Sequence, residues 1–168
     1  NKIADVDFFK NVVVNIQKKV PINSDRIFVV GHSNGGMMCH RLAREAADVF
    51  DGIAVVAGAM NFTDDGVHGP IATLLIHGTN DKDVLFEGGP AGTRGKKRID
   101  ASLKSAVDYY VLRNGLVAYP QTDAEDGVEF ARYLTGKDKV GVPPVWVVTL
   151  KKGGHAWPGQ PHQPRLAG

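Results

Sequence analysis

A glycine-rich turn between an apolar strand and a helix constrains this chain more than any other feature. Residues 26–30 are typical of a buried strand, and a helix is expected to begin at about Asn34. Between them, Gly31-His32-Ser33-Asn34-Gly35 matches G-x-S-x-G, a pattern that carries a nucleophilic serine when it lies between strand and helix. Side chains two residues before and after Ser33 would collide in so sharp a turn, so we expect glycine at both positions. The alternative is a glycine-rich turn without chemistry.

Apolar segments separated by helical patterns predict an α/β fold with a mostly parallel sheet and flanking helices. The expected strands are Arg26–Val30, Gly52–Ala57, Ile71–Ile76, Val128–Leu134 and Val145–Leu150. The expected helices are Asp5–Val20, Asn34–Ala47 and Ile99–Arg113, with a glycine-rich loop over Phe86–Gly95. The second and third strands are expected to be buried on both faces, and the fourth to be half exposed at an edge.

Three polar groups fall where predicted strands end: Ser33, the acidic pair Asp81 and Asp83, and His155. Ligands of parallel sheets bind at the carboxyl ends of the strands. The chain order Ser, Asp, His is that of the α/β hydrolases. Spacing favours Asp81 over Asp83 as the acid but leaves both open.

The three residue types suit nucleophilic catalysis. A serine hydroxyl needs a base, and a histidine is suited to that task near neutral pH. An acid holds the imidazole in the right tautomer and stabilises its charged form. The backbone N–H of Asn34, directly after Ser33, is the expected oxyanion donor.

The other histidines are better explained as structural or exposed. The ring of His32 is expected to point away from the Ser33 hydroxyl. The remaining ones are His40, His68, His77 and His162. A zinc site built on His155 and His162 lacks cysteine or carboxylate partners at ligand spacing, so we expect no metal and no cofactor.

Charge excludes some classes of partner. The chain has 20 basic and 18 acidic residues, a net charge of +2, which favours neither nucleic acid nor a membrane surface. A basic run over Arg94–Arg98 lacks interleaved aromatic residues and is expected to be a solvated loop or helix start. The single cysteine, Cys39, is expected to be a small buried residue.

Around Ser33, Asp81 and His155 the chain resembles the polyhydroxybutyrate depolymerase and feruloyl-esterase group, relatives of the family-one carbohydrate esterases. The matching segments are Asp25–Met38, Ile76–Asp81, Glu87–Gly89 and Gly153–Gly159, the last containing Gly-Gly-His-Ala-Trp-Pro-Gly. The resemblance implies Ser33 as nucleophile, Asp81 rather than Asp83 as acid, and His155 as base.

The resemblance also implies a substrate class. It implies an α/β-hydrolase fold acting on feruloyl or acetyl esters of polysaccharide, or on short polyhydroxyalkanoate chains, in an extracellular or periplasmic compartment. Trp157 at the mouth of the cleft, with His32, would then contact the substrate, although Trp157 is equally well explained as packing of its loop.

The family fold begins several strands before the helix at Asp5, and those strands hold the loop with the second oxyanion donor. We therefore expect residues 1–168 to form one α/β-hydrolase domain that is incomplete at its N-terminus, with the missing part as a partner. Two alternatives stay open. One is a non-catalytic binding remnant, or a fragment inactive without the missing strands. The other is acyl transfer to an alcohol instead of water.

Overall fold

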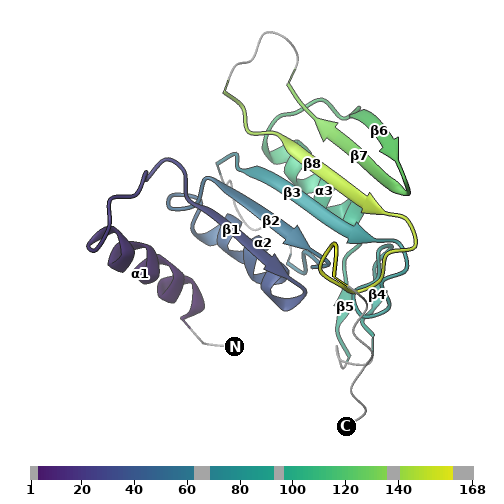
Figure 1. Ribbon diagram of the computed structural model, residues 1–168, viewed down its shortest axis with the longest axis horizontal. Coiled ribbons are helices and arrows are strands. Elements are labelled where there is room, and N and C mark those ends of the chain that lie inside the picture. Colours follow the sequence, from purple (N-terminus) through teal and green to yellow (C-terminus); the bar gives the residue numbers. More distant parts are fainter. Residues whose placement is uncertain (1–3, 63–68, 93–96, 136–140, 161–168) are drawn as a thin grey trace.

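A six-stranded sheet forms the centre of the protein, in the order β1-β2-β3-β8-β7-β6 (Figure 1). The computed structural model describes residues 4–62, 69–92, 97–135 and 141–160. The first four strands of this order are parallel, and β7 and β6 continue the sheet as an antiparallel hairpin. The strands are β1 Phe28–His32, β2 Gly52–Val56, β3 Ala72–Gly78, β6 Gln121–Glu125, β7 Val128–Tyr133 and β8 Val145–Leu150.

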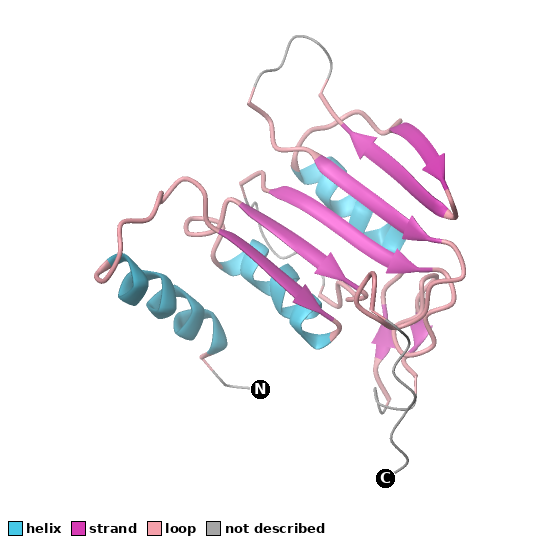
Figure 2. Cartoon of the chain, viewed as in Figure 1, coloured by secondary structure: helices cyan, strands magenta, loops and turns pink. Residues whose placement is uncertain are grey.

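Two helices cover one face of this sheet (Figure 2). Helix α2 (Asn34–Glu45) packs on β1 and β2, and α3 (Leu103–Arg113) packs on β3 and β8. Helix α1 (Asp5–Gln17) lies beyond β1 and packs against α2. None of the described helices is long and apolar enough to cross a membrane.

The core lies between the sheet and these helices. Its fully buried members include Tyr110, Leu75, Val145 and Cys39, so the cysteine is buried as predicted. A smaller cluster joins α1 to α2 through Val6, Leu42, Ala46 and Phe50. Burying each large apolar side chain stabilises the fold by roughly 1.5–3 kcal/mol, so these two clusters hold the helices on the sheet.

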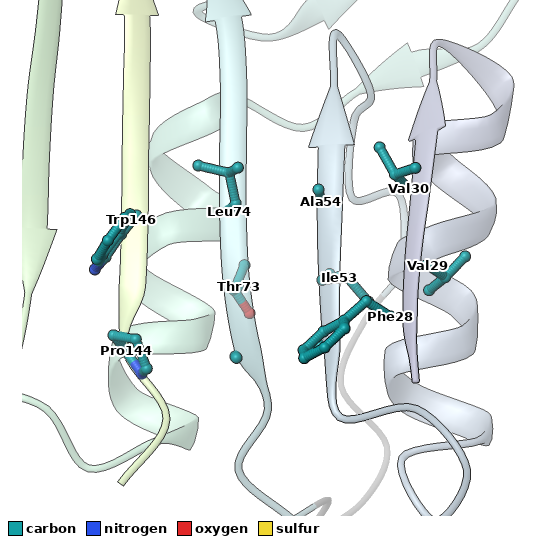
Figure 3. Close-up of a pocket in the computed structure, with 11 residues that line it drawn as sticks. Phe28, Val29, Val30, Ile53, Ala54, Thr73, Leu74, Pro144 and Trp146 are labelled. Atoms are coloured by element: carbon teal, nitrogen blue, oxygen red, sulfur yellow. The ribbon is translucent and has the colours of Figure 1, made fainter. Parts of the chain in front are cut away.

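The opposite face of the sheet is open. Side chains that point away from α2 and α3 remain exposed, among them Phe28 at 61%, Val30 at 60% and Trp146 at 46%. They line a shallow apolar hollow of about 350 Å³ that crosses β1, β2, β3 and β8 (Figure 3). Consequently β3 alternates between buried and half-buried positions, and the prediction that it is buried on both faces was wrong. Strand β2 is buried at four of its five positions.

Helix α3 begins at Leu103, four residues later than predicted. The hydroxyl of Ser102 accepts a hydrogen bond from the backbone N–H of Ser105 at 3.1 Å, which caps the helix. Ile99, assigned by its spacing to the apolar face of the helix, instead lies in β5 (Ile99–Asp100) and is 68% exposed. This short strand pairs with β4 (Gly89–Pro90), inside the segment predicted to be a loop.

The edge of the sheet was also predicted incorrectly. Strand β7 lies between β8 and β6, and β6 forms the edge. Every residue of β6 is exposed, so the strand has no apolar period to reveal it. The turn that joins the two strands, Asp126-Gly127, has φ of 47° and 80° at its two residues, the left-handed conformation that tight hairpins need.

Candidate active site

Ser33 occupies a strained turn at the carboxyl end of β1. Its φ and ψ are 57° and −118°, and it directly precedes the first residue of α2. The backbone N–H of Ser33 donates to the carbonyl of Val56 at 2.8 Å, which fixes the turn to the end of β2. A non-glycine residue with positive φ is costly, and such strain is concentrated at functional sites.

Close backbone approach explains one of the two expected glycines. A Cβ on Gly31 would lie 2.3 Å from the backbone carbon and oxygen of Gly35, so no side chain fits there. A Cβ on Gly35 would meet nothing within 4 Å among the described residues, and the expected need for glycine at that position was wrong. The second tight position is Gly36, where a Cβ would lie 3.0 Å from Cγ1 of Val55.

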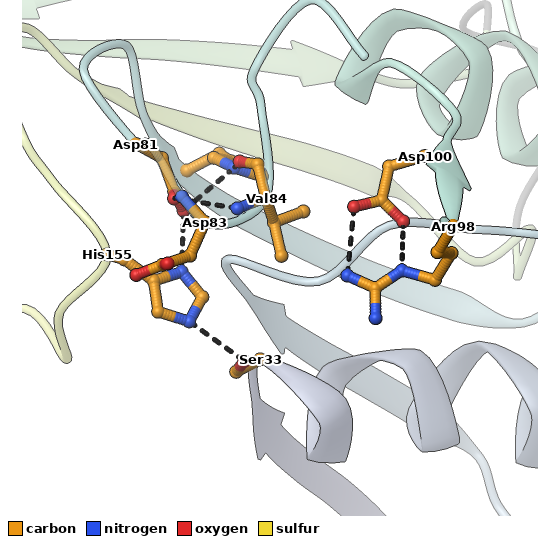
Figure 4. Close-up of polar contacts among 8 residues, drawn as sticks. Ser33, Asp81, Asp83, Val84, Arg98, Asp100 and His155 are labelled. Atoms are coloured by element: carbon orange, nitrogen blue, oxygen red, sulfur yellow. Dashed lines mark hydrogen bonds and ion pairs between the residues drawn. The ribbon is translucent and has the colours of Figure 1, made fainter. Parts of the chain in front are cut away.

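The side chains of Ser33, His155 and Asp81 form a continuous chain of hydrogen bonds (Figure 4). Nε2 of His155 lies 2.8 Å from Oγ of Ser33, and its Nδ1 lies 2.8 Å from Oδ2 of Asp81. Asp81 follows β3 and His155 follows β8, while Ser33 follows β1, so three parallel strands deliver these groups to one edge of the sheet. The side chain of Asp81 is fully buried, and that of His155 is 12% exposed.

The carboxylate that contacts His155 is that of Asp81. Asp83 contributes its backbone N–H to Oδ1 of Asp81 at 2.9 Å, and Val84 does the same. Burial on its own would raise the pKa of Asp81. The hydrogen bonds from His155, His77 and these two backbone groups outweigh burial and hold the pKa far below its usual value. Asp81 is therefore ionised across the whole neutral range.

Backbone contacts hold the loops of Asp81 and His155 together. A Cβ on Gly78 would lie 2.2 Å from the carbonyl oxygen of Gly153, so these two segments are in contact through their main-chain atoms. The N–H of Asn80 donates to that same carbonyl at 2.8 Å. The N–H of Lys152 donates to the hydroxyl of Thr79 at 2.9 Å. The distance between acid and imidazole is thus set by the backbone.

The ring of His32 packs against that of His155, with centroids 4.8 Å apart. Trp157 meets His32 edge-on at 6.4 Å and is 43% exposed. Burial, followed by the neighbouring imidazole of His155, lowers the pKa of His32, against a smaller opposing effect of Asp81. His32 thus lies beside the histidine of the hydrogen-bonded chain, a contact that the sequence did not predict.

Sequence reasoning also missed the contact of His77. It was predicted to be structural or exposed; it is buried, and its Nε2 lies 3.3 Å from Oδ2 of Asp81. The signal was its place at the end of a strand, directly before Gly78 and four residues before the acid. Of the other histidines, His40 is buried against Tyr110, whereas His68 and His162 lie outside the described residues.

No group of three histidine, cysteine, aspartate or glutamate side chains is arranged to hold a metal ion within the described ranges. The basic run over Arg94–Arg98 lies mostly outside them. Its last member, Arg98, pairs with both carboxylate oxygens of the buried Asp100, which in turn accepts from Asn61. This cluster ties the β5 segment to the loop after β2.

Sequence comparison relates the chain to esterases. The model of the prolyl oligopeptidase family matches residues 1–71. The chain is 32% identical to "Putative esterase NocK" of Nocardia uniformis, a match that covers 98% of the chain and 52% of that protein. It is 28% identical to feruloyl esterase B of Piromyces equi over 90% of the chain and 29% of that protein. The chain therefore spans about half or less of the length of these relatives.

Structural comparison agrees. The acetyl xylan esterase from Aspergillus awamori superposes with a TM-score of 0.60 at 15% identity, covering 89% of this chain and 61% of that one. A variant of SOBER1 from Arabidopsis thaliana gives a TM-score of 0.55 at 19% identity, covering 94% and 59%. The fold is that of an α/β hydrolase, of which this chain forms a part, and the chain is a relative of esterases.

Proposed function

We propose that this chain carries the active site of a serine carboxylic-ester hydrolase, with Ser33 as nucleophile, His155 as base and Asp81 as acid. The observation that carries the proposal is the unbroken hydrogen-bonded chain from Oγ of Ser33 through the imidazole to a buried carboxylate, each step 2.8 Å long. The kinship with esterases supports the same reaction class.

The reaction would proceed through an acyl-enzyme. Oγ of Ser33 attacks the ester carbonyl carbon while Nε2 of His155 takes the hydroxyl proton. The tetrahedral intermediate collapses, the C–O bond to the alcohol breaks, and His155 gives its proton to the departing oxygen. Water then attacks the acyl carbon, with His155 again accepting and returning a proton, and the free acid leaves Ser33 regenerated.

The geometry suits each role in this sequence. A donor on Nδ1 facing Asp81 leaves Nε2 as the lone-pair nitrogen that faces Ser33. The buried, ionised Asp81 stabilises the imidazolium that forms when His155 accepts the proton. The strained turn lifts Oγ of Ser33 clear of the sheet, so a substrate can approach it.

The negative charge on the tetrahedral intermediate needs hydrogen-bond donors. The backbone N–H of Asn34, at the first residue of α2, is the proposed first donor, at the positive end of the helix dipole. From the family resemblance, we propose that a second donor lies on a loop upstream of these residues. Loss of one such donor costs about 10²–10³ in rate, so this second group matters greatly for turnover.

For the substrate, we propose acetyl or feruloyl esters of polysaccharide, with short polyhydroxyalkanoate chains as the second choice. The names of the relatives, feruloyl esterase and acetyl xylan esterase, favour the first class. Trp157 and His32 form an aromatic corner beside His155, and Trp157 retains exposed ring surface. An aromatic or acyl group could pack on that surface.

Ser33→Ala tests this proposal. We expect hydrolysis of p-nitrophenyl acetate and butyrate to fall to background, because Ser33 supplies the attacking oxygen in the proposed mechanism. Ser24→Ala, at an exposed turn, is the matched control and should keep full activity. Hydrolysis that persists in Ser33→Ala would remove Ser33 from the mechanism.

The alternative is a non-catalytic remnant, or a fragment inactive without further strands. Two observations support this alternative: the open apolar face of the sheet, and the match to only about half of a relative's length. A fluorophosphonate labels only an activated serine, so intact protein that stays unlabelled would favour this alternative. Labelling confined to Ser33 would favour the hydrolase.

A further inference from the structure

A second histidine reaches the carboxylate oxygen that contacts His155. His77 is the penultimate residue of β3 and is only 3% exposed. Its Nε2 lies 2.9 Å from the carbonyl oxygen of Val84 and 3.3 Å from Oδ2 of Asp81. The ring of Phe86 packs edge-on against it at 5.9 Å, which limits its movement.

These distances determine which nitrogen of His77 carries hydrogen. The carbonyl oxygen of Val84 can only accept, so Nε2 must be the donor at 2.9 Å. The same N–H also faces Oδ2 of Asp81 and forms a weaker second branch of a three-centre hydrogen bond. Because Nε2 carries its hydrogen in both the neutral and the charged ring, this donation does not depend on the charge of His77.

The carboxylate of Asp81 is held at both oxygens. Oδ1 accepts from the backbone N–H groups of Asp83 and Val84, each at 2.9 Å. Oδ2 accepts from His155 and faces His77. Four donors thus lie around the two oxygens, which matches the about four lone-pair sites that an ionised carboxylate offers. The side chain cannot rotate without losing several hydrogen bonds at once.

We propose that His77 is a positioning residue for the reaction, acting through Asp81 on His155. The inference rests on the proposed function, in which these two residues are acid and base. His77 has two effects on the pair. It fixes the direction in which Oδ2 points, and it draws part of the negative charge away from that oxygen.

The second effect has a direction that can be measured. Less charge on Oδ2 stabilises the imidazolium of His155 less strongly. Without the donor, Oδ2 of Asp81 would carry more negative charge. The acidic limb of the pH profile for labelling of Ser33 would then shift to higher pH. A residue that only packed the loop would leave this limb unmoved.

Two variants separate the donor from the packing. His77→Gln keeps an N–H at nearly the position of Nε2, and His77→Leu replaces the ring with an apolar group that has no donor. The measurement is the second-order rate of fluorophosphonate labelling of Ser33 between pH 5 and 9, in the intact protein. Ser33→Ala supplies the blank. Thermal unfolding of each variant confirms that folded protein is being compared.

We expect His77→Leu to lower the plateau rate by at least about tenfold and to move the midpoint of the acidic limb to higher pH, because the carboxylate is both misaligned and more basic. His77→Gln should restore the midpoint and most of the rate. If His77→Leu does not fold, His77→Met takes its place, since its flexible side chain also has no hydrogen-bond donor.

Three results would overturn the inference. They are a donorless variant with the wild-type midpoint, a donorless variant with the wild-type plateau, and a Gln variant as defective as the donorless one. Failure of the wild-type protein to label at Ser33 is a different result, because it would overturn the proposed function itself.

Discussion

His40 is a titratable residue that lies in the core, far from solvent. It is 1% exposed, its ring stacks on that of Tyr110, and its Nδ1 lies 2.9 Å from the tyrosine hydroxyl. Burial lowers the pKa of His40 to about 4, against a smaller opposing effect from the backbone of Gly58. In the unfolded chain the same group titrates near 6.5. The folded protein therefore resists a proton that the unfolded chain accepts.

This difference predicts a loss of stability in mild acid. Below about pH 6.5 the unfolded state binds the proton and the folded state does not, so the free energy of unfolding falls as pH falls. The loss continues down to about pH 4, where the folded protein also binds the proton. At about 1.4 kcal/mol per unit, it amounts to roughly 3 kcal/mol over this window. Urea unfolding at pH 7.5, 6.0 and 4.5 measures it.

His40→Asn is the matched comparison, because it keeps a polar partner for Tyr110 but cannot titrate. The variant should be less stable at pH 7.5 and should show a flatter dependence on pH between 6.5 and 4. Equal slopes in the two proteins would contradict the assignment of this effect to His40.

At the residue scale, the sequence located the hydrogen-bonded side chains but not their surroundings. The G-x-S-x-G motif and the ends of the predicted strands indicated Ser33, Asp81 and His155, because both signals can be read from the local sequence. The contact of His77 with Asp81 depends on how the loop after β3 folds back on its own strand. Whether a side chain would fit at Gly35 depends on the direction in which its Cβ would point. Neither can be derived from spacing.

Two loops that follow β3 and β8 hold the acid and the imidazole at a fixed distance, and Gly78 lies where they touch. In Gly78→Ala the new Cβ would lie 2.2 Å from the carbonyl oxygen of Gly153, a backbone atom that must move. We expect the two loops to separate and fluorophosphonate labelling of Ser33 to fall by about 10² or more, because small displacements of catalytic groups are costly.

Gly69→Ala is the control for that change. A Cβ at this exposed position meets nothing within 4 Å among the described residues, so labelling and thermal stability should both stay at wild-type values. Wild-type labelling in Gly78→Ala would show that the loops can adjust without disturbing the site.

At the element scale, apolar strands were predictable and polar ones were not. Val145–Leu150 was predicted with its observed bounds, because a continuous apolar run records its burial. Strand β6 has four polar residues out of five and is exposed throughout, and only the Asp126-Gly127 turn and the pairing with β7 define it. The start of α3 depends on the Ser102 cap, which overrides the apolar period that extends back to Ile99.

The whole molecule has one covered and one open face of the sheet, although parallel sheets are normally covered on both. We propose that these 168 residues are part of a larger α/β-hydrolase domain whose remaining elements cover this face. The length of the relatives supports this proposal. An intact mass above the 18.1 kDa of these residues, measured on protein from its natural source, would agree with it.

A polypeptide limited to these residues should bind an apolar fluorescent dye strongly, because Phe28, Val30 and Trp146 form a contiguous exposed surface. The double variant Val30→Lys with Trp146→Lys should lose most of that signal. Leu112→Lys removes an exposed leucine (83%) from α3, on the covered side, and should leave the signal unchanged. Equal dye binding by all three proteins would place the apolar surface elsewhere.

The position of β8 has a consequence for how the chain folds. It is the last of the described strands along the sequence, yet it lies in the interior of the sheet, between β3 and β7. During synthesis, β1, β2 and β3 can assemble early, and β6 and β7 can form their hairpin separately. The two pieces join only when β8 is inserted between them, a step that needs contacts between distant residues and is therefore slow. Because His155 follows that strand, the hydrogen-bonded chain to Ser33 forms only with the final closing of the sheet.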